Sequence, residues 1–253
     1  MSAVRRERPT LLTSPNRPTP VNATQPSPQD QPAYRGAEVA HILALPYGTV
    51  MAWSFGQDYK QQDGSPKRFV AVIQPADKAN KLLSFTNLCE LHLLAVIRRR
   101  HRITMPQVRK SVDYLRQQLG VDRPLASSRF LTNGVALFVE HAGQLLNVSQ
   151  SGQQALRADF EKALTRIQFG ENGNPVTLFP YTRMHTDAEQ PLSVLVDPLR
   201  AFGRPVVSGA FVRTEVIEQR FRAGDSIAAM AQDYGVSASE VEEALRFESR
   251  RAA

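Results

Sequence analysis

The sequence is poor in cysteine, with only Cys89 among 253 residues, and it has no long apolar run. One thiol excludes an internal disulfide and any metal site built from cysteines alone. Cys89 lies in the apolar stretch LCELHLLAVI, where we expect it to be a small buried residue. No apolar run approaches the ~20 residues that span a bilayer, and the amino terminus has no apolar signal core. We therefore expect a cytoplasmic protein without a membrane partner.

The residue types that carry catalysis are scattered along the chain. The five histidines, at positions 41, 92, 101, 141 and 185, do not form the HExxH pattern of a zinc site. Neither of the glycine-rich phosphate-binding patterns, GxxxxGKS/T and GxGxxG, occurs. Cys89 has no convincing partner base in the sequence. These absences favour a binding protein over an enzyme, and they predict no cofactor and no metal.

Positive charge is concentrated in the first half of the chain. The whole protein has a formal net charge of +7. Residues 34–130 carry 15 Lys and Arg against 7 acidic residues, a net charge of +8, whereas residues 131–203 carry −2 and residues 204–253 carry −1. A cluster of cations is the electrostatic signature of nucleic-acid binding. We therefore expect any DNA contact to come from the first half.

The first 33 residues hold seven of the 17 prolines. Proline removes a backbone donor and fixes φ, so it interrupts regular helices and sheet ladders. Few apolar residues remain to offset the entropy of ordering. Residues 1–33 are therefore predicted to be a disordered tail, whose Arg5, Arg6 and Arg8 either touch phosphates or remain solvated.

Two stretches near opposite ends of the chain share one spacing. GAEVAHILALPYGTV and the closing SIAAMAQDYGVSASEVEEAL both read as two short helices joined by a tight turn. A small residue in the first helix lets the two helices approach. The turn lies four residues after it, and an apolar residue ten residues after it anchors the second helix on the first. The equivalent pairs are Ala40 and Ala231, Ala44 and Gly235, and Val50 and Val241. We interpret them as two helix-turn-helix units.

The first unit is followed by elements that suit DNA binding. KRFVAVI, residues 67–73, predicts a strand that forms a wing, and a helix from about Ser84 precedes another that Gly120 ends. Trp53 is expected in the core. Arg98, Arg99 and Arg100 lie at the end of the helix that starts near Ser84. They either contact phosphates or only stabilise the helix dipole, which needs no ligand. The candidate DNA-binding residues are Tyr47, Thr49, Lys60, Lys67, Arg68, Arg98, Arg99 and Arg100.

The second half predicts hairpins and then helices. GVALFVEHAGQLLNVS is expected to be a hairpin turning at Ala142-Gly143, and TRIQFGENGNPVTLFPYT a hairpin turning at residues 171–174. SVLVDPLRAFGRPVVSG is expected to be extended, and the chain is expected to be helical from Thr214. Asp225 or Ser226 is predicted to cap one helix, and Ser237 with Glu240 to form a capping box.

These elements predict an α+β protein that is mainly helical. Its expected parts are the disordered tail at 1–33, a winged helix-turn-helix region at 34–130, a β-hairpin connector at 131–200 and a helical domain at 201–253.

The closing segment from PLRAFGRPVVSG to EEALRF resembles a widespread bacterial and archaeal domain of formerly unknown function. That domain is homeodomain-like and is similar to antitoxins encoded beside PIN-domain ribonuclease toxins. The sequence upstream of this segment, in residues 83–99, 123–134 and 148–156, resembles longer VapB-type antitoxins that have a MerR-like winged unit. The MerR-like pattern usually reads TVRRW, whereas Met51 and Ala52 replace the arginines here. The closing residues that fit the pattern are Pro205, Gly209, Phe221, Gly224, Ser226, Tyr234, Gly235, Val241 and Ala244.

The resemblance implies a type II antitoxin that represses its own operon by binding operator DNA and neutralises a PIN-like ribonuclease toxin. We expect a homodimer, because winged units usually read two half-sites. An arginine inserted into the toxin's acidic metal site would pair with its carboxylates. The candidate toxin-binding residues are Arg246, Arg250 and Arg251.

Acidic residues on the last helix argue against DNA binding by the second unit. Glu240, Glu242 and Glu243 are expected to face the would-be groove, where phosphates would repel them. We therefore expect this unit to bind protein or to form a dimer. Two alternatives remain for the whole chain. One is a free-standing MerR-like regulator with a small ligand, and the other is an adaptor without a nucleic-acid role.

Overall fold

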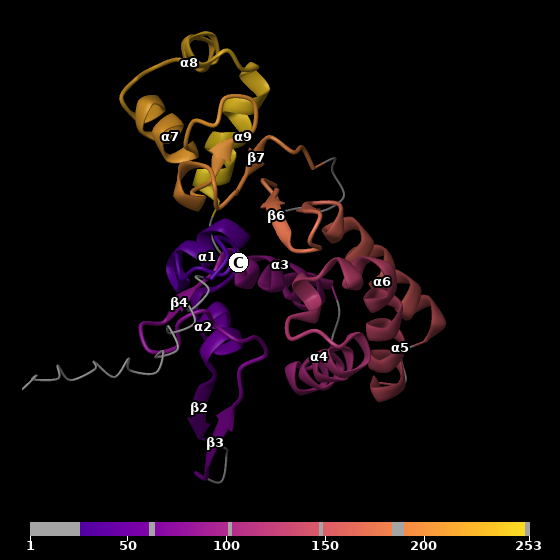
Figure 1. Ribbon diagram of the computed structural model, residues 1–253. Coiled ribbons are helices and arrows are strands. Elements are labelled where there is room, and N and C mark those ends of the chain that lie inside the picture. Colours follow the sequence, from indigo (N-terminus) through magenta and orange to yellow (C-terminus); the bar gives the residue numbers. More distant parts are fainter. Residues whose placement is uncertain (1–25, 61–63, 101–102, 147–148, 184–189, 251–253) are drawn as a thin grey trace, which may run out of the picture.

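The computed structural model describes residues 26–60, 64–100, 103–146, 149–183 and 190–250, without the side chains of residues 98–100 and 146. Over these ranges the chain is mainly helical, with four two-stranded antiparallel sheets. The predicted α+β, mainly helical class is thus confirmed. Figure 1 shows helices α7 to α9 at one end, the hairpin of β2 and β3 at the other, and helices α4 to α6 to one side.

The first part of the described chain contains the predicted pair of helices. The helices α1 and α2 form the pair, the strands β2 and β3 form the hairpin in the predicted wing position, and β1 pairs with β4. The wing strand is shorter than predicted, because the chain leaves the sheet after Phe69 to bury Val72 and Ile73. The bounds are β1 Tyr34–Arg35, α1 Gly36–Leu43, α2 Tyr47–Phe55, β2 Gln57–Lys60, β3 Pro66–Phe69 and β4 Leu82–Leu83.

A helical block follows, and it overturns one prediction. Residues 135–146 form a helix and not a hairpin, because the apolar residues Val135, Phe138, Val139 and Ala142 recur at helical spacing and are all buried. Gly143 is no turn residue. A Cβ there would lie 2.6 Å from the Gln153 side chain of the next helix, so glycine permits close packing. The bounds are α3 Phe85–Arg100, α4 Met105–Leu119, η1 Pro124–Ala126, η2 Phe130–Gly134, α5 Val135–Leu146 and α6 Gln150–Leu164.

The second predicted hairpin is present, and the chain is helical from Thr214 as predicted. Helix caps also follow the sequence. Ser226 accepts from the Ala229 N–H, Ser237 and Glu240 form the capping box, and left-handed Gly120 ends α4. The bounds are β5 Ile167–Phe169, β6 Pro175–Leu178, β7 Val194–Leu195, η3 Ala201–Gly203, β8 Val206–Val207, α7 Thr214–Arg222, α8 Ile227–Tyr234 and α9 Ala238–Ser249.

The two predicted helix-turn-helix units have the same turn. In the first, left-handed Ala44 (φ 48°) ends α1, and the Leu45 N–H donates to the Ala40 carbonyl at 2.9 Å. In the second, left-handed Gly235 (φ 64°) ends α8, and the Val236 N–H donates to Ala231 at 3.0 Å. The apolar anchors Val50 and Val241 are both fully buried. The shared spacing therefore encodes a shared local structure.

The sequence predicts a disordered tail at residues 1–33, but residues 26–33 are held against the rest of the chain. The carboxylate of Asp30 accepts hydrogen bonds from the Thr86 hydroxyl at 2.8 Å and from the Arg123 guanidinium at 2.9 Å. The Thr86 N–H also donates to the Gln29 carbonyl at 3.0 Å. These contacts fix the segment on α3. Residues 1–25 lie outside the described residues.

One core joins most of the described chain. It runs from α1 and α2 through α3 to the helices α4 to α6, and Phe247 of α9 belongs to it. A smaller cluster around Val207, Ile217 and Met230 holds α7 to α9 together. The last helix therefore packs on both clusters. Within the described ranges, no helix is long and apolar enough to cross a bilayer.

Candidate nucleic-acid interface

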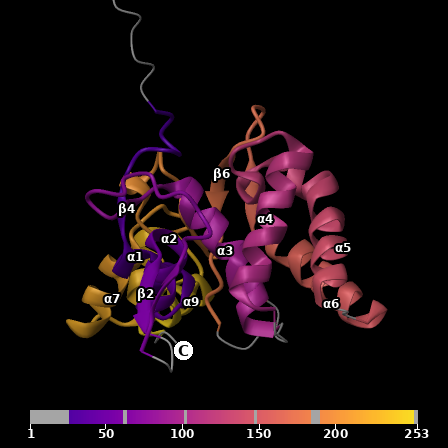
Figure 2. The ribbon, with the colours of Figure 1, turned by 90° about the horizontal axis from the view of Figure 1, so that it is seen from below.

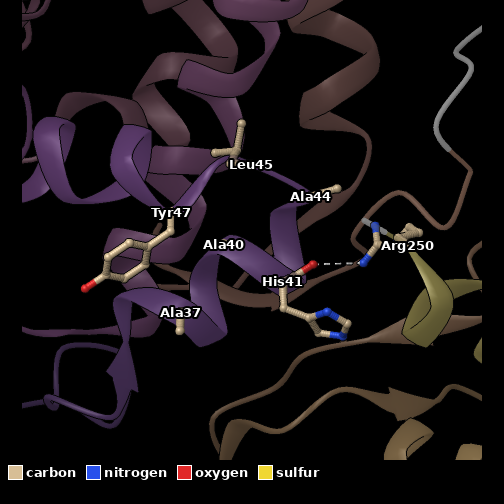
Figure 3. Close-up of a pocket in the computed structure, with 7 residues that line it drawn as sticks. All are labelled: Ala37, Ala40, His41, Ala44, Leu45, Tyr47 and Arg250. Atoms are coloured by element: carbon tan, nitrogen blue, oxygen red, sulfur yellow. Dashed lines mark hydrogen bonds between the residues drawn. The ribbon is translucent and has the colours of Figure 1, made fainter. Parts of the chain in front are cut away.

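Helix α2 presents a cation-free outer face, and no side chain caps its amino end. Tyr47 is exposed and Thr49 half-buried in its first turn, and Pro46 at the cap position supplies no side-chain acceptor. Uncapped N–H groups at a helix start attract anions such as phosphate. In Figure 3 the Tyr47 ring points away from Arg250, on the side of α2 remote from the closing helix. Trp53 is buried, as predicted.

The hairpin of β2 and β3 supplies the cations that α2 lacks. Every residue of β2 is exposed, as are Lys67 and Arg68 on β3. The register pairs Tyr59 with Lys67 and Asp58 with Arg68, so these pairs lie on opposite faces of the hairpin. Lys60 shares the Asp58 face because side chains alternate along a strand.

Arg68 has an acceptor of its own within the hairpin. Its guanidinium lies 3.2 Å from the Asp58 carboxylate. Both side chains are well exposed, and an exposed ion pair contributes roughly 0–1 kcal/mol. Asp58 nevertheless offsets the charge that Arg68 would offer to a phosphate. Lys60 and Lys67 are therefore the stronger candidates for backbone contacts.

Sequence reasoning missed Gly56, which permits the hairpin, and Arg109, which fixes the hairpin on α4. Gly56 has φ 80°, and a Cβ there would lie 2.7 Å from the Phe69 carbonyl oxygen, so only glycine lets the hairpin start here. Arg109 of α4 donates to the carbonyls of Val70 and Ala71 and lies 5.0 Å from the centroid of the Phe69 ring. No local sequence pattern indicates the Arg109 contact, because 38 residues separate it from Ala71.

The acidic closing helix turns two of its glutamates inward. Glu243, expected to face a groove, is only 1 % exposed, and it accepts hydrogen bonds from Thr182, Arg183 and Arg246. Burial would raise the pKa of Glu243, but the hydrogen bonds from Arg183 and Thr182 and the nearby charges outweigh it and lower that pKa. Glu240 closes the capping box. Glu242 is exposed.

Glu248 joins the closing helix to the first unit. Its carboxylate lies 2.9 Å from Nε2 of His41 on α1 and also accepts from the Thr214 hydroxyl. Burial again acts to raise the pKa of Glu248, and the bonds from His41 and Thr214 overcome it, so the pKa is lowered. The His41 ring also meets Phe247 edge-on, with 5.3 Å between centroids. Helix α9 thus uses its inner face to hold the rest of the chain.

Of the other predicted site residues, some lie outside the described part and the others make contacts within the fold. Arg98, Arg99 and Arg100 lie at the end of α3, and their side chains are outside the described part, as is all of Arg251. Arg246 pairs with Glu243. Arg250 stacks on the Phe247 ring at 4.0 Å and donates to the carbonyls of Tyr181, His41, Ile42 and Phe247. Its guanidinium is therefore used to join α9 to α1 (Figure 3).

A small pocket lies where α1 and α9 meet. Its volume is about 270 Å³, and three alanines form much of its wall. Figure 3 shows Arg250 at one side and Tyr47 at the other. Arg250 and His41 are both engaged elsewhere, so the pocket offers mainly apolar surface. Among the described residues, no group of three or more His, Cys, Asp or Glu is placed to hold a metal ion.

Comparison with known proteins found one matching family and two similar proteins of one organism. Residues 194–247, from β7 through most of α9, match a family described as "Protein of unknown function (DUF433)". "Putative antitoxin VapB45" of Mycobacterium tuberculosis is 28 % identical over 233 residues, covering 85 % of this chain and 93 % of the relative. "Uncharacterized protein Rv2308" of the same organism is 23 % identical, covering 86 % and 90 %.

The crystal structure of Rv2018 from M. tuberculosis shares the fold. It superposes with a TM-score of 0.61 at 23 % sequence identity, covering 85 % of this chain and 98 % of that one. The protein therefore contains a DUF433 segment and is a distant homologue of a protein named as an antitoxin.

Proposed function

We propose that the protein is a type II antitoxin, which binds operator DNA as an autorepressor and neutralises a PIN-like ribonuclease toxin. The observation that carries the proposal is the extent of the similarity to the protein named "Putative antitoxin VapB45". It covers 85 % of this chain and 93 % of that relative, far more than the closing segment alone. That name also favours a binding role over an enzymatic one.

The surface supports a division of labour between the two helix-turn-helix units. Helix α2 has an open amino end beside a wing with exposed Lys60 and Lys67. Backbone phosphates bind such cations with little dependence on sequence. The start of α9 is instead closed by Ser237 and Glu240, and its inner face is buried. The first unit is thus the DNA reader, and we expect it to act in a homodimer on two half-sites.

The test uses the promoter of this gene and the product of the neighbouring gene. We expect the full-length protein to shift its own promoter fragment in a gel at low salt and to lose affinity steeply as salt rises. We also expect co-expression to restore growth of cells that express the neighbouring product. A protein that binds the fragment but never relieves toxicity would instead be a free-standing MerR-like regulator. The apolar pocket beside α1 favours that second candidate, since it offers space for a small ligand.

A further inference from the structure

A loop before the closing helices exposes large apolar side chains. Phe202 is 95 % exposed and Leu199 is 73 % exposed, and Phe211, which follows β8, is also exposed. Single exposed apolar residues are common on protein surfaces. Here three of them lie on neighbouring turns, because Arg200 between them stacks on the Phe211 ring at 3.9 Å. We call Leu199, Phe202 and Phe211 the Phe202 surface.

The backbone holds this surface in an unfavourable conformation. Ala201, Phe202 and Phe211 all have φ between 46° and 55°, in the left-handed region that residues with bulky side chains avoid. The loop is held by the Tyr34 hydroxyl, which donates to the Gly203 carbonyl at 3.0 Å. Gly203 itself has no room for a Cβ, which would clash with the same hydroxyl. Strained residues persist only where the surroundings fix them, and they cluster at binding sites.

The charges around the Phe202 surface are mainly outward cations. Arg200 pairs with Asp197 at 3.2 Å, but the arginine side chain is 50 % exposed and the carboxylate only 16 %. Arg204 pairs with Glu38, and again the arginine is the more exposed partner. Arg213, close to Phe211, differs from these two, because it pairs with Glu215 at 3.6 Å and the glutamate is the more exposed partner. An apolar centre with aromatic residues and arginine is the composition found at protein interfaces.

We propose that the Phe202 surface, with Arg200 and Arg204 at its rim, is the docking surface for a partner protein that offers an apolar pocket bordered by carboxylates. This inference rests on the proposed function, in which that partner is the toxin. It places the main contact away from Arg250, whose guanidinium joins α9 to α1.

Charge argues against the two occupants that the chain itself could supply. Residues 1–25 carry four arginines and one glutamate, so this segment is cationic like the rim. In a symmetric contact with a second copy centred on Phe202, the arginines nearest the two-fold axis would face their own copies. Like charges across an interface oppose association. An acidic partner surface is the complement that the rim fits.

The test replaces Phe202 with glycine. Phe202→Gly removes the ring and supplies the residue that best tolerates a left-handed backbone. We therefore expect an unchanged or higher Tm, which a residue needed for packing would not give. Binding of the purified, catalytically inactivated neighbouring product, measured by calorimetry, should weaken roughly tenfold or more. The matched control is Phe221→Ala on α7, another exposed phenylalanine, which should bind as the parent does.

Three outcomes would count against the inference, and they are distinguishable. Parental affinity in Phe202→Gly would overturn the docking surface while leaving the antitoxin function intact. A change in the oligomeric state of free Phe202→Gly protein, measured by sedimentation, would show that a second copy occupies the surface. Failure of the parent protein to bind the neighbouring product would overturn the proposed function, and the partner assignment with it.

Discussion

Glu90 is a carboxyl group kept away from water in α3. It is 4 % exposed and accepts a hydrogen bond from Asn87 at 2.9 Å. Burial raises the pKa of Glu90 from 4.5 to about 7, although Asn87 and the charges of Arg123 and Arg116 act in the opposite direction. The folded protein thus binds this proton more tightly than the unfolded chain. The contribution of Glu90 to stability is greatest below pH 4.5 and is lost as the pH rises to about 7.

Glu90→Gln should remove that pH dependence. Glutamine keeps the acceptor for Asn87 and cannot ionise, so the variant should gain up to about 3 kcal/mol over the parent at pH 8. At pH 4.5 the two proteins should have similar free energies of unfolding. Urea denaturation at several pH values measures the free energy of unfolding of both proteins. The contributions of the other titrating groups cancel in the difference between variant and parent. Parallel curves for parent and variant would show that folding does not shift the pKa of Glu90.

Glu243 and its neighbour Glu242 form a matched pair for the role of the acidic closing helix. Glu243→Ala leaves Arg183, Arg246 and Thr182 without their shared acceptor. We expect a loss of roughly 1–3 kcal/mol in unfolding free energy, because the buried Thr182 hydroxyl and two partly exposed guanidinium groups lose their acceptor. Glu242→Ala removes an exposed charge and should change stability by less than about 0.5 kcal/mol. Thermal unfolding of the two variants compares them, and equal small effects would mean that the Glu243 contacts do not stabilise the fold.

At the scale of the element, the wing can be tested against an equal change of charge elsewhere. Replacing Lys60 and Lys67 with alanine should weaken promoter binding equally for all duplex sequences. It should also lower the slope of log affinity against log salt by about 2, one for each lost phosphate contact. The control replaces Lys78 and Lys81, both exposed in the turn before β4, and removes the same charge. Binding titrations over a salt series would assign DNA contact to the wing only if the control keeps the parental slope.

Elements with local signals were predictable from the sequence. Ser226, Ser237 and Gly120 mark helix ends by chemistry within four residues, and residues 171–174 mark the second hairpin. The first predicted hairpin is wrong, because Gly143 is not a turn residue but permits the approach of Gln153. The distinction depends on a partner helix and is not visible locally.

The candidate site divides in the same way. Lys60 and Lys67 follow from charge and a strand pattern, and the matching turns follow from spacing. The contacts of Glu243 with Arg183 and of Glu248 with His41 join residues 60 and 207 positions apart. Sequence reasoning therefore found an acidic helix but placed Glu243 on the surface. Folding brings Arg183 to Glu243 and His41 to Glu248, and no local sequence pattern indicates either contact.

At the scale of the whole molecule, the closing helix packs against the unit formed by α1 and α2. Phe247 is fully buried in the core that includes α1, and its ring meets His41. We expect Phe247→Ala to cost roughly 3–5 kcal/mol and to weaken promoter binding as well, because α1 supports α2. Phe221→Ala in the same set of helices is the control. If Phe247→Ala lowers Tm but binds DNA like the parent, the two ends of the chain are joined without being coupled.

The hydrogen bond from Tyr34 to Gly203 has a consequence for synthesis on the ribosome. The bond joins residues separated by 169 positions, so β1 lacks this partner until Gly203 has been translated. At about 5–20 residues per second, that interval is on the order of ten seconds or more. Arg250 reaches α1 later still, because it lies 209 positions after His41. In a nascent chain, α1 and β1 therefore lack these contacts for most of the time of translation. Products truncated before Gly203 would lack both the Tyr34 and the Arg250 hydrogen bonds.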